Sequence, residues 1–99
     1  MMNKEQMVNL LGICQKAKKL VSGEMFSLEK IKNKEAKLVF LASDAGPNTS
    51  KRVRDKSAFY AVEIIDSLDT DELSMAIGKN NRKVIAIIDK GFAEKMKTL

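Results

Sequence analysis

The fold is decided by residues 38–56, which read Leu38-Val39-Phe40-Leu41-Ala42-Ser43-Asp44-Ala45-Gly46-Pro47-Asn48-Thr49-Ser50-Lys51-Arg52-Val53-Arg54-Asp55-Lys56. The unbroken apolar run 38–42 predicts a strand buried on both faces, because a half-exposed strand would alternate with polar residues. Turn and cap residues follow, and then a basic helical segment. Strand, polar turn and helix form the unit of α/β layers, in which ligands gather where a strand ends and a helix begins. We therefore look for function first at residues 43–51.

The sequence on either side predicts further helices and strands in alternation. Helices are expected at roughly 3–19, 24–33, 47–60, 70–77 and 92–98, and strands at 19–23, 38–42, 61–65 and 84–88. This order predicts an α/β fold, a three-layer α-β-α sandwich around a four-stranded sheet, formed by a single domain over residues 1–99.

Helical spacing also predicts which side chains face the core. The inner face of the first helix is expected to carry Met7, Leu10, Leu11, Cys14 and Ala17; that of the second Met25, Leu28 and Ile31; and that of the third Val53, Ser57 and Tyr60. Thr70 is expected to cap the fourth helix, and Gly78 to follow its end.

Composition limits the kinds of protein this can be. The net charge of +5 favours a polyanionic partner, although a basic surface that serves only solubility is the alternative. The single Cys14 cannot form an internal disulfide, which is typical of a reducing compartment. No apolar run is long enough for a membrane span, and the polar start is not that of a signal peptide. We expect a cytoplasmic protein with no membrane partner.

The chain offers little for catalysis or for holding a metal. It has no histidine, no Walker loop and no Gly-x-Gly-x-x-Gly motif. The acidic cluster at 66–72 could bind a divalent cation, but helix capping explains it better. Asp44 has no general-base partner and is expected to organise its turn. We therefore expect no enzyme, no cofactor and no metal.

Lysines and arginines are concentrated in four segments, at 16–19, 30–37, 51–56 and 79–83. If these segments converge, they form a phosphate-binding surface. If they do not, they are scattered surface cations, and the sequence alone leaves both possibilities open.

Three segments, 10–23, 38–49 and 72–79, together resemble the ribosomal protein L7Ae/L30e family in matching order, and within it the bacterial YlxQ-type branch. The resemblance covers nearly the whole chain. It implies a mixed sheet and binding of structured RNA without catalysis. Family members typically grip a sharply bent kink-turn with the loops that follow the first three strands. Here these loops are 23–29, 43–48 and 66–70.

The first of these loops departs from the family pattern Gly-x-Asn-Glu-x-x-Lys. Gly23 matches, but Met25, Phe26 and Glu29 stand where Asn, Glu and Lys are expected, and Ser74 replaces a usual Gly. A thioether and a phenyl ring cannot hydrogen-bond base edges as an amide and a carboxylate do. We therefore expect RNA affinity to depend mainly on phosphate contacts.

The resulting hypothesis is a non-catalytic, ribosome-associated protein whose partner is structured RNA, ribosomal RNA in particular, and not DNA. A protein-interaction adaptor on the same fold is the alternative. Gly23 would permit close approach, and Phe26, if exposed, would stack on an unpaired base. The expected RNA-binding residues are the cations Lys18, Lys19, Lys30, Lys51 and Arg52, together with Gly23, Met25, Phe26, Ser43, Asp44, Ser67 and Leu68.

Overall fold

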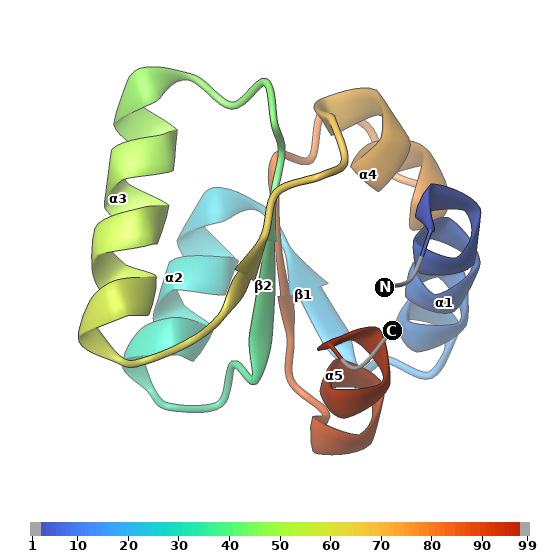
Figure 1. The fold of residues 1–99 in the computed structure, drawn as a ribbon, viewed down its shortest axis with the longest axis horizontal. Coiled ribbons are helices and arrows are strands. Elements are labelled where there is room, and N and C mark those ends of the chain that lie inside the picture. Colours follow the sequence, from blue (N-terminus) through green and yellow to red (C-terminus); the bar gives the residue numbers. More distant parts are fainter. Residues whose placement is uncertain (1–2, 98–99) are drawn as a thin grey trace.

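A computed structural model describes residues 3–97 as five helices and four strands in three layers (Figure 1). Helices α2 and α3 cover one face of the sheet, and α1, α4 and α5 cover the other, which confirms the predicted α-β-α sandwich. The elements in order are α1 (Lys4–Lys16), β1 (Leu20–Ser22), α2 (Glu24–Lys32), β2 (Leu38–Leu41), α3 (Pro47–Phe59), β3 (Ile64–Ile65), α4 (Thr70–Ala76), β4 (Val84–Ile87) and α5 (Lys90–Lys97).

The sheet is mixed, and its strand order is β1-β4-β2-β3. Strand β4 runs antiparallel to both β1 and β2, while β2 and β3 are parallel. Val39 lies opposite Ala86 on one side and Ile64 on the other. The two inner strands, β2 and β4, are buried along their whole length, as their unbroken apolar runs predict.

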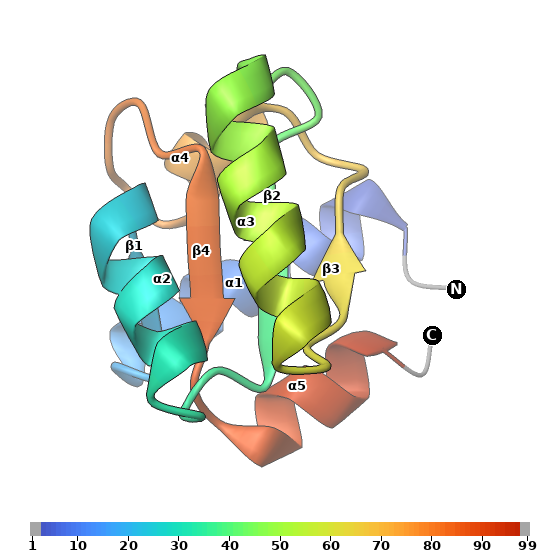
Figure 2. The same ribbon diagram turned by 90° about the vertical axis from the view of Figure 1, so that its left-hand side faces the viewer.

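Alternate residues of β2 and β4 face two separate halves of the core. Leu38 and Phe40 pack among side chains of α1, α4 and α5, whereas Val39 and Leu41 pack toward α2 and α3. Figure 2 shows α2 and α3 side by side in front of the sheet. Cys14 lies in the first half, and its burial raises its pKa to about 11, as expected for a core residue rather than a nucleophile.

Three predictions about inner faces and caps are wrong. Ala17 is exposed, because α1 ends at Lys16 and Lys18 then adopts a left-handed φ of 60°. Met25 is 78% exposed, because the inner face of α2 is formed by Ser27 and Ile31, four residues apart. The cap of α4 is Asp69, whose side chain accepts a hydrogen bond from the backbone N–H of Glu72 at 2.8 Å.

The third strand is shorter than predicted. Ala61 takes a φ of 57°, and the backbone N–H of Val62 bonds back to the Ser57 carbonyl at 2.8 Å, so these residues form a turn after α3. Of the predicted strand 61–65, Ile64 and Ile65 lie opposite β2 residues, and the Glu63 carbonyl accepts a hydrogen bond from the Val39 N–H at 3.0 Å. Helix α5 starts at Lys90, earlier than expected, and the predicted end at residue 98 lies outside the described residues.

Candidate nucleic-acid interface

The loops after β1, β2 and β3 meet at one end of the sheet. Strands β1 and β2 are both antiparallel to β4, and β3 is parallel to β2, so all three end on the same side. In Figure 1 the loops after β2 and β3 lie at the top, with α4. The three loops singled out by the family resemblance therefore lie at one end of the sheet.

The second and third loops are joined by Asp44. Its Oδ1 accepts hydrogen bonds from the Thr70 hydroxyl at 2.6 Å and from the Thr70 backbone N–H at 2.9 Å. These bonds, that of the hydroxyl first, hold the pKa of the Asp44 carboxyl below its ordinary value. The backbone N–H of Ser43 also donates to the Leu68 carbonyl at 2.8 Å. Asp44 thus ties the second loop to the start of α4, whereas the prediction was that it organises its own turn.

Glu24 joins the first loop to the first turns of α3. Its carboxylate accepts from the Thr49 hydroxyl at 2.9 Å and forms two hydrogen bonds with the Arg52 guanidinium. The Arg52 bond, followed by the Thr49 bond, holds the pKa of Glu24 below its ordinary value. Helices α2 and α3 are therefore tied together at their N-terminal ends.

A fourth loop, residues 79–83, lies between the other loops. Because β4 sits between β1 and β2, the segment that precedes it enters the sheet between their ends. The Gly23 N–H donates to the Val84 carbonyl, and the Ala42 N–H to the Lys83 carbonyl, both at 2.8 Å. We call the four loops at 23–29, 43–48, 66–70 and 79–83 the loop end.

Arg82 and Lys83 were not among the residues predicted for the site. The backbone N–H of Arg82 donates a hydrogen bond to the Ser74 hydroxyl at 2.7 Å. The Arg82 guanidinium lies beside Gly23, 3.6 Å from the position that a Cβ on this residue would take. Gly23 itself has a φ of 97°, a conformation that favours glycine. The basic run 79–83 is visible in the sequence, but its position depends on the strand order.

Three of the five predicted phosphate-binding cations lie away from the loop end. The Lys19 carbonyl accepts from Ile88, just after β4, so Lys18 and Lys19 are at the opposite end of the sheet. Lys30 belongs to the last turn of α2 and pairs with Glu35 at 3.3 Å.

The other two predicted cations, Lys51 and Arg52, lie near the start of α3. Both are engaged within the protein, Lys51 with Asp55 at 2.8 Å and Arg52 with Glu24. The Lys51–Asp55 pair is exposed on both sides and such pairs contribute little to stability, so a phosphate can compete for Lys51, whereas Arg52 is held by two hydrogen bonds to the half-buried Glu24.

The remaining predicted residues are distributed between the surface and the core. Met25 and Phe26 are 78% and 61% exposed, so the condition set for stacking on Phe26 is met. Ser43 and Ser67 are exposed as well. Leu68 is only 1% exposed and packs in the core, so its side chain cannot contact RNA. It can contribute only through its main chain.

The 79–83 loop supplies the cations that are least engaged. Within residues 3–97, Lys79, Arg82 and Lys83 take part in no ion pair. Lys83 donates to the Asn81 side chain at 2.7 Å. The cations of the loop end are thus concentrated in this loop, where Lys79 is exposed and Arg82 and Lys83 are half-buried.

The acidic residues at 66–72 have structural roles, and two of them cap a helix, as the sequence predicted. Asp69 and Glu72 form a reciprocal capping box at the start of α4, and Asp66 pairs with Arg54 at 2.8 Å. In the part of the chain that the structure describes, no group of three or more acidic, cysteine or histidine side chains could hold a metal ion. Nor does any helix within residues 3–97 have the length and apolar character to cross a membrane.

The family model of the ribosomal protein L7Ae/L30e/S12e/Gadd45 family matches residues 5–97. The chain belongs to this family. It is 43% identical over 97 residues to the RNA-binding protein YlxQ of Enterococcus faecium, covering 98% of this chain and 93% of that protein. Identity to the YlxQ protein of Bacillus subtilis (strain 168) is also 43%, over 91% of this chain and 90% of that protein. The resemblance to the YlxQ-type branch is thereby confirmed.

Two solved structures of other proteins support the fold. A protein of unknown function from Bacillus halodurans is similar with a TM-score of 0.86 and 36% identity, over 90% of each chain. The 15.5kD RNA binding protein of Giardia lamblia has a TM-score of 0.81, over 91% of this chain and 80% of that chain. At 18% identity the latter supports the fold alone.

Proposed function

We propose that this protein binds structured RNA, without catalysis, through the loop end. The observation that carries the proposal is the position of the 79–83 loop, which brings Arg82 and Lys83 between the loops that follow β1 and β2. Cations fixed at the meeting point of four loops can contact phosphates from several directions. The two relatives named RNA-binding proteins support RNA as the ligand.

The relation to the ribosome is part of this proposal. The family description includes ribosomal proteins, and ribosomal RNA is the structured RNA that we propose as the partner. Co-sedimentation of the tagged protein with ribosomal particles in a lysate tests this step. Recovery only at the top of the gradient would contradict it while leaving RNA binding intact.

RNA binding itself is tested by fluorescence anisotropy with a kink-turn RNA and with a fully paired RNA of equal length. Replacing both cations, Arg82→Gln with Lys83→Gln, is expected to weaken binding to each RNA. The matched control is Lys16→Gln, because Lys16 is exposed in the last turn of α1. Equal binding by the double variant and the control would refute the proposed site.

A second candidate function is protein binding by an adaptor. Met25 and Phe26 favour it, since two large apolar side chains lie exposed at the start of α2. Their neighbourhood favours RNA instead, because Arg82 lies against Gly23 and Arg52 against Glu24. A partner that is retained after ribonuclease treatment and lost in Phe26→Ser would support the adaptor.

A further inference from the structure

The C-terminal end of α3 carries an aromatic pair that the proposed function does not use. Phe59 is 80% exposed, and its ring meets that of Tyr60 edge to face, with centroids 4.9 Å apart. Burying a phenylalanine side chain is favourable, so an exposed one forgoes that stabilisation. The ring is available to an outside partner.

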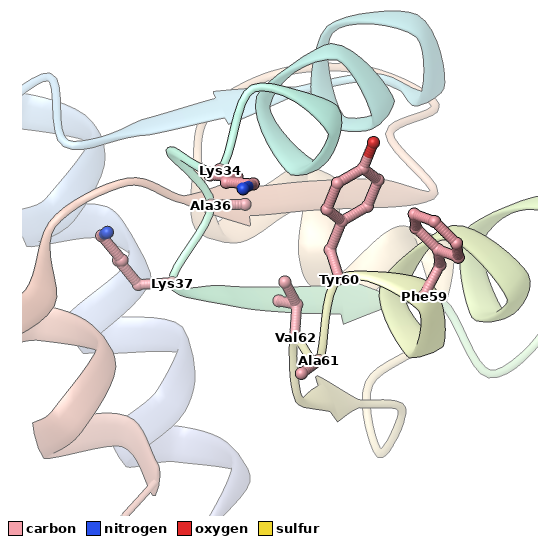
Figure 3. Close-up of a pocket in the computed structure, with 7 residues that line it drawn as sticks. All are labelled: Lys34, Ala36, Lys37, Phe59, Tyr60, Ala61 and Val62. Carbon is pink, nitrogen blue, oxygen red and sulfur yellow. The ribbon is translucent and has the colours of Figure 1, made fainter.

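An open hollow of about 570 Å³ lies against this pair. Its walls come from the turn after α2 and the turn after α3, and include Lys34, Lys37, Phe59, Tyr60 and Val62. In Figure 3, Lys34 extends toward the ring of Tyr60, and Phe59 stands beside it. A volume of this size is within the range of small-molecule sites.

A second hollow, also about 570 Å³, lies on the α2–α3 side of the same two rings. Leu28, Lys56 and Asp55 contribute to it. Phe59 and Tyr60 line both hollows, so they form the ridge between them. A planar group stacked on this ridge would leave room in the hollow on each side for its substituents.

The charge around the rings is positive. Lys34, Lys37 and Lys56 form no ion pair within residues 3–97, and no carboxylate lines the first hollow. The single acidic residue of the second hollow, Asp55, is paired with Lys51. Lysine is depleted in protein–protein interfaces, whereas an aromatic ring among cations is the pattern of single-stranded nucleic-acid sites.

We call the region around Phe59 and Tyr60, with Lys34, Lys37 and Lys56, the aromatic end, and it is separate from the loop end. Helix α3 starts at Pro47, beside the loop end, and reaches Phe59 after 13 residues. At 1.5 Å per residue, the two ends of the helix are about 18 Å apart. The backbone N–H of Lys37 donates to the Ile87 carbonyl, at the opposite end of β4 from Gly23 and Val84.

We propose that the aromatic end is a second RNA contact, which takes an unpaired nucleotide. The base stacks on Phe59, and the phosphates on either side contact Lys34 and Lys56, with Lys37 at the rim. RNA as the ligand class rests on the proposed function. The second contact would add affinity for RNAs that carry a single-stranded extension beside the structured part.

The test titrates the isotope-labelled full chain with a short single-stranded oligouridylate and follows the backbone amide resonances. Shifts are expected in the two turns of the aromatic end, around Lys34 and Tyr60. Base–aromatic stacking implies that Phe59→Ala weakens binding by about five-fold or more. Because Phe59 is exposed, this variant is expected to fold, which its circular dichroism spectrum checks.

Three variants separate this inference from the proposed function. Lys16→Gln is expected to leave oligouridylate binding unchanged, whereas Lys34→Gln with Lys56→Gln weakens it. The double variant Arg82→Gln with Lys83→Gln is expected to weaken the binding of structured RNA. It should leave the amide shifts that oligouridylate causes at Tyr60 unchanged.

Shifts confined to the loop end, or unchanged affinity in Phe59→Ala, would overturn the second contact while the proposed function stands. An effect of Phe59→Ala on self-association alone, measured by analytical ultracentrifugation, would overturn it in favour of contact between two copies of the chain. Failure of the unaltered chain to bind either RNA would overturn both proposals.

Discussion

Gly23 is the position where backbone strain and the candidate site coincide. Its φ of 97° and ψ of 150° lie in a region that is essentially restricted to glycine. A Cβ there would meet the Arg82 guanidinium at 3.6 Å, an ordinary contact, so crowding adds little. The cost of Gly23→Ala is therefore backbone strain, about 1–3 kcal/mol of unfolding free energy.

Gly46 provides the matched control. It precedes α3, has an ordinary φ of −63°, and has no atom within 4 Å of an added Cβ. Gly46→Ala is expected to stabilise the protein by about 0.4–1 kcal/mol, because alanine lowers the entropy of the unfolded chain without straining the fold. The two substitutions make the same chemical change with opposite expected signs.

Urea unfolding and thermal unfolding, each followed by circular dichroism, measure both variants. Gly23→Ala should lower the melting temperature by roughly 4–8 °C per kcal/mol in a domain of this size. It should also weaken the binding of structured RNA, because the backbone around position 23 would shift to relieve its strain and the first loop would lose its position beside Arg82. Equal stability of the two variants, within about 0.5 kcal/mol, would show that alanine is not strained at position 23 and refute the reasoning.

Three further predictions follow from the described contacts. Glu24 has a lowered pKa when folded, so its stabilising effect is present above the unfolded value of 4.5 and is lost as pH falls through the folded value. Glu24→Gln should flatten the stability profile in that acid range, and an unchanged profile would contradict this. Asp69→Ala removes the cap of α4 and should cost about 0.5–2 kcal/mol in urea unfolding, whereas exposed Asp71→Ala should cost less. If about four phosphates are neutralised at the loop end, log K for RNA should fall against log salt with a slope of about −3 to −4, and a salt-independent constant would exclude phosphate contacts.

Local sequence was sufficient wherever neighbouring residues set the structure. The unbroken apolar runs of β2 and β4 predicted strands buried on both faces. Pro47 marked the start of α3, and Gly78, with a φ of 68°, marked the end of α4. Errors fell where two local signals competed, as at Asp69 and Thr70, since either residue type can cap a helix and only the backbone geometry chooses between them.

The position of the 79–83 loop was decided by tertiary structure alone. The sequence shows a basic turn before an apolar strand, but not that this strand enters the sheet between β1 and β2. Strand order depends on how all the helices and strands pack together, so no short segment carries it. The same holds for the link between Glu24 and Arg52, and for the distance between Lys19 and the loop end. The residue types needed to bind phosphate were set by the sequence, whereas which of them share one surface was set by the order of the strands.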